Sequence, residues 1–220
     1  GRHLFRIPTQ DFTVDPSRIV NVSYNRADYS FTLTELVDFI ENKSIYGGKL
    51  GAIEKGSQGK MLMKANHGAF IAKPKEPSLT RFANKITSHT RTQEEISQSL
   101  LDFVTNEISY GGGDDIYDGE ILKRPNEVLL TRASDCSGKA ILYASLLEQK
   151  GIDFRLGYFG SNPGSEGHIS VLVSGNFPNN NGLSYIIDEK EYAIAEPTTP
   201  GFIIGQTRIK LVAEELDYIQ

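Results

Sequence analysis

The sequence contains one cysteine, four histidines and a late glutamate whose order could support thiol chemistry. Cys136 follows Ser134 and Asp135, either of which can cap a helix. His168 begins the apolar run HISVLVS, and Glu196 follows the run YAIA. A thiolate nucleophile needs a base within hydrogen-bond reach, and the base needs a third group that fixes its orientation. The order Cys136, His168, Glu196 therefore predicts a nucleophile, a general base and an orienting carboxylate.

The segment after Cys136 has the apolar spacing of a helix. One helical face is expected to carry Ala140, Tyr143, Ala144 and Leu147 before Lys150-Gly151 ends the pattern. Cys136 would then lie in the first turn, where free backbone N–H groups and the positive end of the helix dipole favour thiolate over thiol. We therefore expect a reactive sulfur at the start of a rigid helix.

The remaining histidines and acids are weaker candidates for the other two roles. His3 is terminal, His67 lies in a glycine-rich segment, and His89 lies in a polar turn between two predicted helices. Asp188 remains an alternative to Glu196, because any nearby carboxylate could orient the imidazole. Taken alone, a cysteine in an apolar helix is more often a small core residue, so the catalytic interpretation depends on its ordered partners.

Helices are predicted before the cysteine and strands after it. One helix is expected over residues 78–87 and another after Thr92, where Glu95 completes a capping box. Period-two apolar patterns then predict strands at 154–159, 168–174, 183–187 and 192–195. This order indicates an α+β fold in which the cysteine helix packs on an antiparallel meander.

The first part of the chain has a weaker pattern. It predicts a strand at 18–24, a short helix at 32–42 and a strand at 60–64, with glycine-rich turns between them. We therefore expect two regions. A small N-terminal αβ region covers residues 1–77, and its independent folding is left open; a catalytic domain covers residues 78–220.

Composition limits the classes of partner. With 39% hydrophobic and 23% charged residues, the chain is typical of soluble globular proteins. The net charge of −5 and the lack of long Lys/Arg runs disfavour nucleic acid and anionic membrane surfaces. No apolar run is long enough to span a membrane. The compartment is left open, and an apolar segment at the start of a precursor would favour an extracytoplasmic location.

Metal and cofactor motifs are weak. A single cysteine excludes an intrachain disulfide and a cysteine-built zinc site. The stretch GSQGK is not a phosphate loop, because Glu54 and Met61 occupy the positions of the first glycine and the hydroxyl. The acidic loop at 114–120 could bind calcium, but it lacks EF-hand spacing and a solvated acidic turn is the commoner interpretation. We expect no cofactor.

The region from about residue 108 to residue 201, a little under half of the chain, resembles the transglutaminase-like superfamily of the papain-like cysteine enzymes. The motifs that carry the resemblance are SDCSG around Cys136, GHI at His168 and EPT at Glu196, in that order. The flanking segments PNEVLLTRASDC and LLEQKGIDFRLGYF are also similar. The resemblance implies a papain-like core, with the catalytic helix packed on an antiparallel sheet, and a Cys136–His168–Glu196 triad.

Two features depart from the family pattern. The usual family acid is aspartate, whereas Glu196 is one methylene longer and still able to accept a hydrogen bond from imidazole. The chain has no tryptophan, the residue that cross-linking transglutaminases use near the oxyanion. The Cys136 backbone N–H is the expected first oxyanion donor, and the second donor is left unassigned.

The resemblance implies acyl transfer from an amide. The expected reaction is hydrolysis of a protein, peptide or other amide substrate through a thioester on Cys136. One alternative is transfer to an amine, the cross-linking activity of a true transglutaminase, which incorporation of a labelled amine would reveal. The other is a catalytically silent binding or assembly module, against which the presence of all three triad residue types argues.

Overall fold

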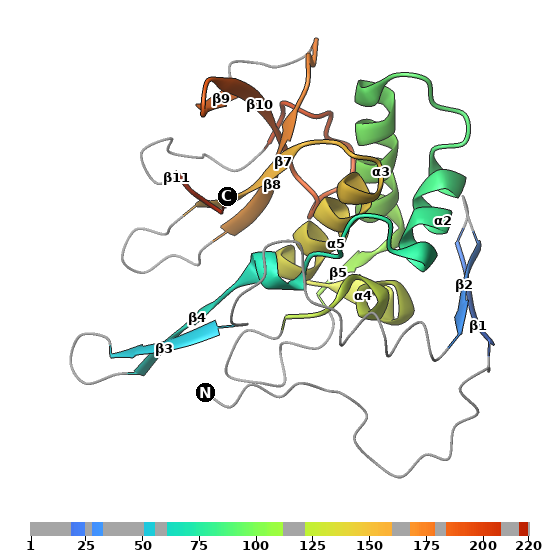
Figure 1. The fold of residues 1–220 in the computed structure, drawn as a ribbon, viewed down its shortest axis with the longest axis horizontal. Helices are drawn as coiled ribbons and strands as arrows, with labels where there is room; N and C mark the ends of the chain where they lie inside the picture. The colour runs from blue at the N-terminus through green and yellow to red at the C-terminus, as the bar shows by residue number, and fades with distance from the viewer. Residues whose placement is uncertain are drawn as a thin grey trace.

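The computed structural model describes residues 19–24, 28–32, 51–55, 61–111, 122–159, 168–178, 184–207 and 216–219. These residues form a mixed α+β fold in which helices pack against an antiparallel sheet (Figure 1). The helices are α2 (Pro77–Ile86), α3 (Gln93–Glu107), α4 (Pro125–Thr131) and α5 (Cys136–Gln149), with a short 3₁₀ helix, η2 (His67–Phe70).

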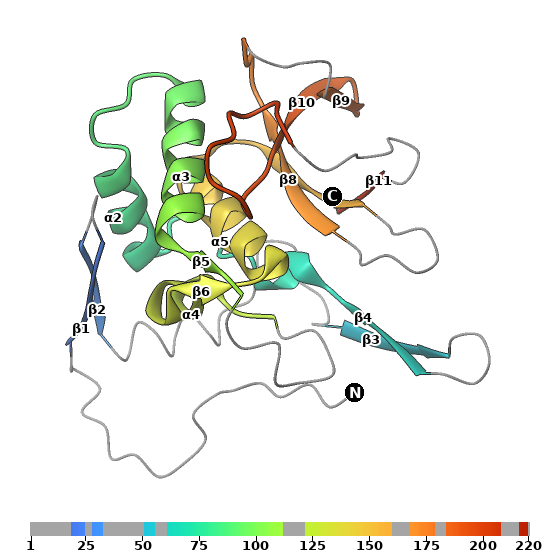
Figure 2. The ribbon, with the colours of Figure 1, turned by 180° about the vertical axis from the view of Figure 1, so that it is seen from behind.

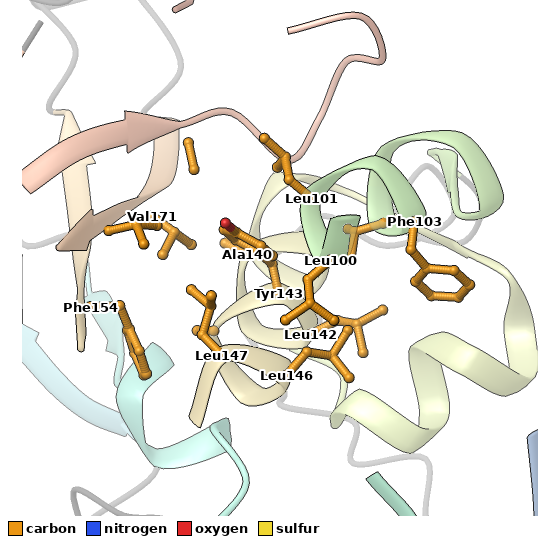
Figure 3. Packing of buried hydrophobic residues seen from close by; sticks show 14 of the residues in the cluster. Leu100, Leu101, Phe103, Ala140, Leu142, Tyr143, Leu146, Leu147, Phe154 and Val171 are labelled. Carbon is orange, nitrogen blue, oxygen red and sulfur yellow. The ribbon is translucent and has the colours of Figure 1, made fainter. Parts of the chain in front are cut away.

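Helix α5 is the centre of this arrangement. It lies between strand β8 (His168–Ser174) and helix α3, as Figure 2 shows from behind. Every residue from Ser137 to Leu147 is buried. The predicted apolar stripe is therefore only part of the buried surface, because α2, α3 and α4 cover the sides of α5 that face away from the sheet. Figure 3 shows Tyr143, Leu146 and Leu147 of α5 packed among side chains of α3 and the sheet.

Local capping explains where the two longest helices begin. The Thr92 hydroxyl accepts a hydrogen bond from Glu95 N at 3.1 Å, and the Glu95 carboxylate accepts one from Thr92 N at 3.2 Å, which confirms the predicted capping box of α3. Of the two candidate caps of α5, Asp135 is the one used, because its carboxylate accepts from Gly138 N at 3.0 Å. Helix α2 confirms the helix predicted at 78–87 within one residue at each end.

The main sheet has five strands among the described residues, in the order β11-β7-β8-β10-β9, and every pairing is antiparallel. Strand β8 is accompanied by β7 (Phe154–Phe159), β9 (Ser184–Ile187), β10 (Lys190–Ala195) and β11 (Leu216–Ile219). The four predicted strands are confirmed, whereas β11 was not predicted.

The predicted meander is wrong in its strand order. Strand β10, not β9, pairs with β8, and β9 lies at the edge. Burial explains why β10 takes the position beside β8 that was predicted for β9. The β10 segment from Tyr192 to Ala195 is fully buried and suits an interior position, whereas Ile186 of β9 is 79% exposed. Asp188 and Glu189, which have φ angles of 51° and 63°, form the tight turn that joins the two strands.

Other strands form two-stranded pairings among the described residues. Strand β1 (Ile19–Ser23) pairs with β2 (Asp28–Thr32), and β3 (Gly51–Lys55) pairs with β4 (Met61–Ala65). Strands β1 and β4 confirm the predictions at 18–24 and 60–64. Apart from Thr32, which ends β2, the helix predicted at 32–42 lies outside the described residues, as does the acidic loop at 114–120.

Residues from the predicted N-terminal region contact the core around α5. Tyr24 packs edge-on against Phe103 with ring centroids 5.0 Å apart, and its hydroxyl donates to the Leu129 carbonyl. Its ring also meets Phe82, and the Arg132 guanidinium lies 4.5 Å from its centroid. The predicted boundary at residue 77 stays a prediction, but Tyr24 itself belongs to the main core.

The segment from His67 to Glu76 runs along one face of α5. Three polar contacts reach α5 residues that are eight and four positions apart, and so lie on one face: His67 Nε2 to Ser137 Oγ at 3.1 Å, Ala72 N to Ser145 Oγ at 3.0 Å, and Glu76 N to Gln149 Oε1 at 2.8 Å. This segment therefore supports the helix that begins with the cysteine.

Tyr24→Ala should destabilise the protein strongly. The change removes a buried aromatic ring, for which the usual loss in the free energy of unfolding is about 3 to 5 kcal/mol. Urea unfolding followed by circular dichroism measures this loss. Tyr110→Ala is the matched control, because Tyr110 is 62% exposed and its loss should stay within about 0.5 kcal/mol. Equal losses in the two variants would contradict the docking of Tyr24 in the core.

Candidate functional site

Cys136 is the first residue of α5 and is partly exposed. The chain reaches it through β6 (Ala133–Ser134), which pairs in parallel with β5 (Ser109–Tyr110). Backbone hydrogen bonds hold this junction, from Ser109 N to Arg132 O at 2.9 Å and from Gly111 N to Ser134 O at 3.1 Å. The start of α5 is therefore fixed by the short β5–β6 ladder as well as by its cap.

Gly138 lies very close to the Ser134 side chain at the same junction, so this position requires a residue without a Cβ atom. A Cβ atom on this residue would lie 1.9 Å from the Oγ atom and 2.9 Å from the Cβ atom of Ser134. Because neither contact is sterically possible, only glycine lets Ser134 pack against the first turn of α5. Gly138 therefore lets Ser134, at the end of β6, lie close against the first turn of α5.

His168 lies beside the sulfur and beside a carboxylate. It opens β8, its Nε2 atom lies 2.8 Å from Glu196 Oε2, and Cys136 lies close enough to raise the pKa of its imidazole. With Nε2 directed at the carboxylate, Nδ1 is the ring nitrogen available to the sulfur. The structure thus brings together the three residues that the sequence selected.

Glu196 directly follows β10 and is 1% exposed. Its Oε2 atom accepts hydrogen bonds from His168 and from Ser170 Oγ, the latter at 3.0 Å. Its Oε1 atom accepts from Thr198 N at 3.1 Å and from Thr198 Oγ1 at 2.5 Å. Burial alone would raise the pKa of this carboxyl, but the bonds from His168 and Thr198 outweigh burial and lower the pKa. Glu196 is therefore held as a carboxylate.

The same contacts shift the pKa of the His168 imidazole in the opposite direction. Burial of the ring lowers its pKa, but the hydrogen bonds and negative charges of Cys136 and Glu196 outweigh burial and raise the pKa from 6.5 to about 9. His168 is consequently protonated at neutral pH. It can donate one proton to Glu196 and present the other toward the sulfur.

These shifts define the pH range in which the His168–Glu196 pair stabilises the fold. The raised pKa of His168 contributes stability that is complete below pH 6.5 and is lost as the pH rises through about 9. The lowered pKa of Glu196 contributes stability that is present above its ordinary value of 4.5 and is lost as the pH falls below it. The pair is therefore most stabilising between pH 4.5 and 6.5.

Neither the alternative acid Asp188 nor any described histidine other than His168 occupies the position of Glu196 or His168. Asp188 is exposed in the β9–β10 turn, at the opposite end of β10 from Glu196. His89 is exposed in the turn between α2 and α3, and His3 is outside the described residues. His67 is buried, and its contact with Ser137 places it beside the first turn of α5. No local pattern signals that contact, because the two residues are 70 positions apart.

Ser170 joins the site without having been predicted. Its hydroxyl lies 3.0 Å from His168 Nε2 and donates to Glu196. Since side chains two residues apart in a strand point to the same face, Ser170 shares the face of His168. The alternation in HISVLVS was therefore a signal that could have identified it.

Clusters of metal ligands and membrane-spanning helices are both absent from the described residues. In that part of the chain, no three His, Cys, Asp or Glu side chains are grouped so that they could hold a metal ion. Among the same residues, no helix has the length and apolar character needed to cross a membrane.

Comparison with solved structures gives several matches, two of which are described below. No protein-family model and no curated protein matches the sequence. A candidate cysteine protease from Cytophaga hutchinsonii is 19% identical over 64% of this chain, with a TM-score of 0.40. A candidate protease from Parabacteroides distasonis ATCC 8503 is 12% identical over 89% of this chain, with a TM-score of 0.39. This chain spans 40% and 41% of their respective lengths. With both TM-scores below 0.5, the function proposed below rests on the residues of this chain.

The titration of His168 tests the electrostatics of the site. In the native protein the His168 ring should titrate near pH 9, and Glu196→Gln should move that titration down toward 6.5, because the variant keeps the shape of the side chain but removes its charge. Histidine Cε1–H resonances followed by NMR against pH measure both values. The His89 resonance, from a distant turn, should be the same in the two proteins. A native His168 that titrates near 6.5 would contradict the contacts described above.

Proposed function

We propose that this chain is a cysteine-dependent acyl-transfer enzyme of the transglutaminase-like type, which hydrolyses a peptide or other amide bond. The observation that carries the proposal is the position of His168, whose imidazole hydrogen-bonds the Glu196 carboxylate. The ring also lies close enough to Cys136, the first residue of a buried helix, for Cys136 to raise its pKa. In this proposal Cys136 is the nucleophile, His168 the acid and base, and Glu196 the group that orients the ring. The proposed core is papain-like, with α5 as the nucleophile helix packed on the sheet.

The first half of the proposed reaction forms a thioester. The Cys136 thiolate attacks the carbonyl carbon, a C–S bond forms, and the carbonyl electron pair moves onto oxygen. The Cys136 N–H, in the first turn of α5, has no partner within the helix and can donate to this oxyanion. The intermediate collapses, the C–N bond breaks, and protonated His168 gives its proton to the leaving amine.

The second half releases the product. Neutral His168 takes a proton from water, the resulting hydroxide attacks the thioester carbon, and the C–S bond breaks to return the thiolate and free acid. Throughout both halves Glu196 accepts from His168 Nε2, which leaves Nδ1 for proton transfer. An amine in place of water would give the cross-linking reaction instead, and the absence of tryptophan in the chain favours water.

The proposed substrate is a protein or peptide. Cys136 is partly exposed, whereas its triad partner Glu196 is fully buried, so a substrate carbonyl meets the sulfur first. The catalytic unit in this proposal is residues 78–220, with Tyr24 and the segment from His67 to Glu76 packed onto it.

A peptide library tests the proposed activity. The native protein should generate new carboxyl termini in a diverse peptide mixture, and Cys136→Ala should generate none while it keeps the native melting temperature, because the substitution is small and the residue is partly exposed. Mass spectrometry identifies the termini, and a dansyl-labelled primary amine in the same reactions reports transfer to amines. Cleavage that persists in Cys136→Ala would contradict the proposal. Amine incorporation without cleavage would replace hydrolysis by cross-linking.

A further inference from the structure

Ser170 is a buried serine in an otherwise apolar part of β8. It lies two residues after His168, is 0% exposed, and stands between Ile169 and Val171, which pack in the main core. A hydroxyl that is removed from water is costly unless it is hydrogen-bonded. Ser170 is hydrogen-bonded to two residues of the proposed triad, His168 and Glu196. These contacts indicate a role in the site in addition to packing.

The three side chains form a closed triangle of short contacts. Ser170 Oγ lies 3.0 Å from His168 Nε2 and 3.0 Å from Glu196 Oε2, and the latter two atoms are 2.8 Å apart. The register of the sheet explains this arrangement, because Ala195 of β10 pairs with Val171 of β8 and Glu196 is the next residue. Ser170 therefore contacts the histidine along its own strand and the carboxylate across the strand pair.

The single proton of the Ser170 hydroxyl decides which ring nitrogen of His168 is protonated. An ionised carboxylate can only accept hydrogen bonds, so Ser170 donates its proton to Glu196. Only the oxygen lone pairs of Ser170 are then left for His168 Nε2. Both groups that contact Nε2 are acceptors, and a proton on Nε2 is favoured in the neutral ring as well as in the charged one. The neutral ring is left with Nδ1 as its basic nitrogen.

Ser170 also holds the carboxylate from a different segment than Thr198 does. A glutamate side chain loses much rotamer freedom when it is ordered, so its carboxylate must be held by several contacts. Thr198 holds Oε1 through its N–H and its hydroxyl, but it belongs to the same segment as Glu196, just after β10. Ser170 holds Oε2 from β8, the strand that carries His168. Its hydroxyl therefore ties the carboxylate to the strand of the histidine.

We propose that Ser170 is a positioning residue that keeps the His168 proton on Nε2 and holds the Glu196 carboxylate against the ring, so that Nδ1 remains the nitrogen that exchanges protons in catalysis. This inference rests on the function proposed above and names a fourth residue on which the reaction depends. Because Ser170 is fully buried, it acts through His168 and Glu196.

Ser170→Ala tests the assignment, because the change removes the hydroxyl and leaves Glu196 in place. At a pH above the His168 titration, the NMR chemical shifts of the two ring nitrogens report which one is protonated. The native ring should be protonated on Nε2 alone, whereas the variant should show a mixture of the two neutral forms. Cleavage of the peptide library should slow by about ten- to hundredfold, the size expected for one hydrogen bond to a charged group.

Thr198→Val is the matched control. Valine has the shape of threonine, and the variant loses a hydroxyl donor to the same carboxylate, on Oε1 instead of Oε2. Thr198 has no contact with His168 among those of its hydroxyl and N–H described above. The ring of this variant should therefore stay protonated on Nε2 alone. The nitrogen shifts report the position of a proton and are not moved by a loss of stability alone.

Each remaining outcome decides the question. A folded Ser170→Ala protein with native nitrogen shifts would overturn the assignment, as would the same mixture of ring forms in Thr198→Val. If Ser170→Ala does not fold, Ser170→Cys replaces it, because a thiol fills the site but hydrogen-bonds weakly. A native protein that cuts no peptide of the library would overturn the proposed function itself, whatever the nitrogen shifts are, which separates the two failures.

Discussion

The buried carboxylate of Glu196 is the constraint on which the site depends. A carboxylate that is removed from water must be satisfied by hydrogen bonds, and Glu196 has them from His168, Ser170 and Thr198. These donors come from β8 and from the chain just after β10, which the sheet places side by side. The strand order that brings β10 against β8 is therefore also what orients the imidazole toward the sulfur.

Helix α5 supplies the other half of the arrangement. It is buried on every side, so its first residue cannot shift without disturbing the core. The Asp135 cap, the close contact of Gly138 with Ser134 and the β5–β6 ladder all act on its first turn. Rigidity at this point keeps Cys136 within reach of His168, and the segment from His67 to Glu76 extends the support along the helix.

Local patterns in the sequence predicted the elements better than their arrangement. The capping box at Thr92 and the period-two runs that become β7 and β8 depend on near neighbours, and the structure agrees with them. The exchange of β9 and β10 depends on which strand is buried on both faces, a property of the assembled sheet. Two contacts join segments that are far apart in the sequence, that of His67 with Ser137 and that of Lys139 with Ile108. No local sequence pattern predicts them.

The most direct test of the account is the pH dependence of Cys136 alkylation by iodoacetamide, compared between the native protein and His168→Ala and read by mass spectrometry. An activated cysteine–histidine pair predicts fast labelling well below pH 8.5, the approximate pKa of a free thiol, and loss of that labelling in the variant. Slow labelling with the pH profile of a free thiol, equal in both proteins, would contradict the proposed catalytic site and would favour a binding module built on the same fold.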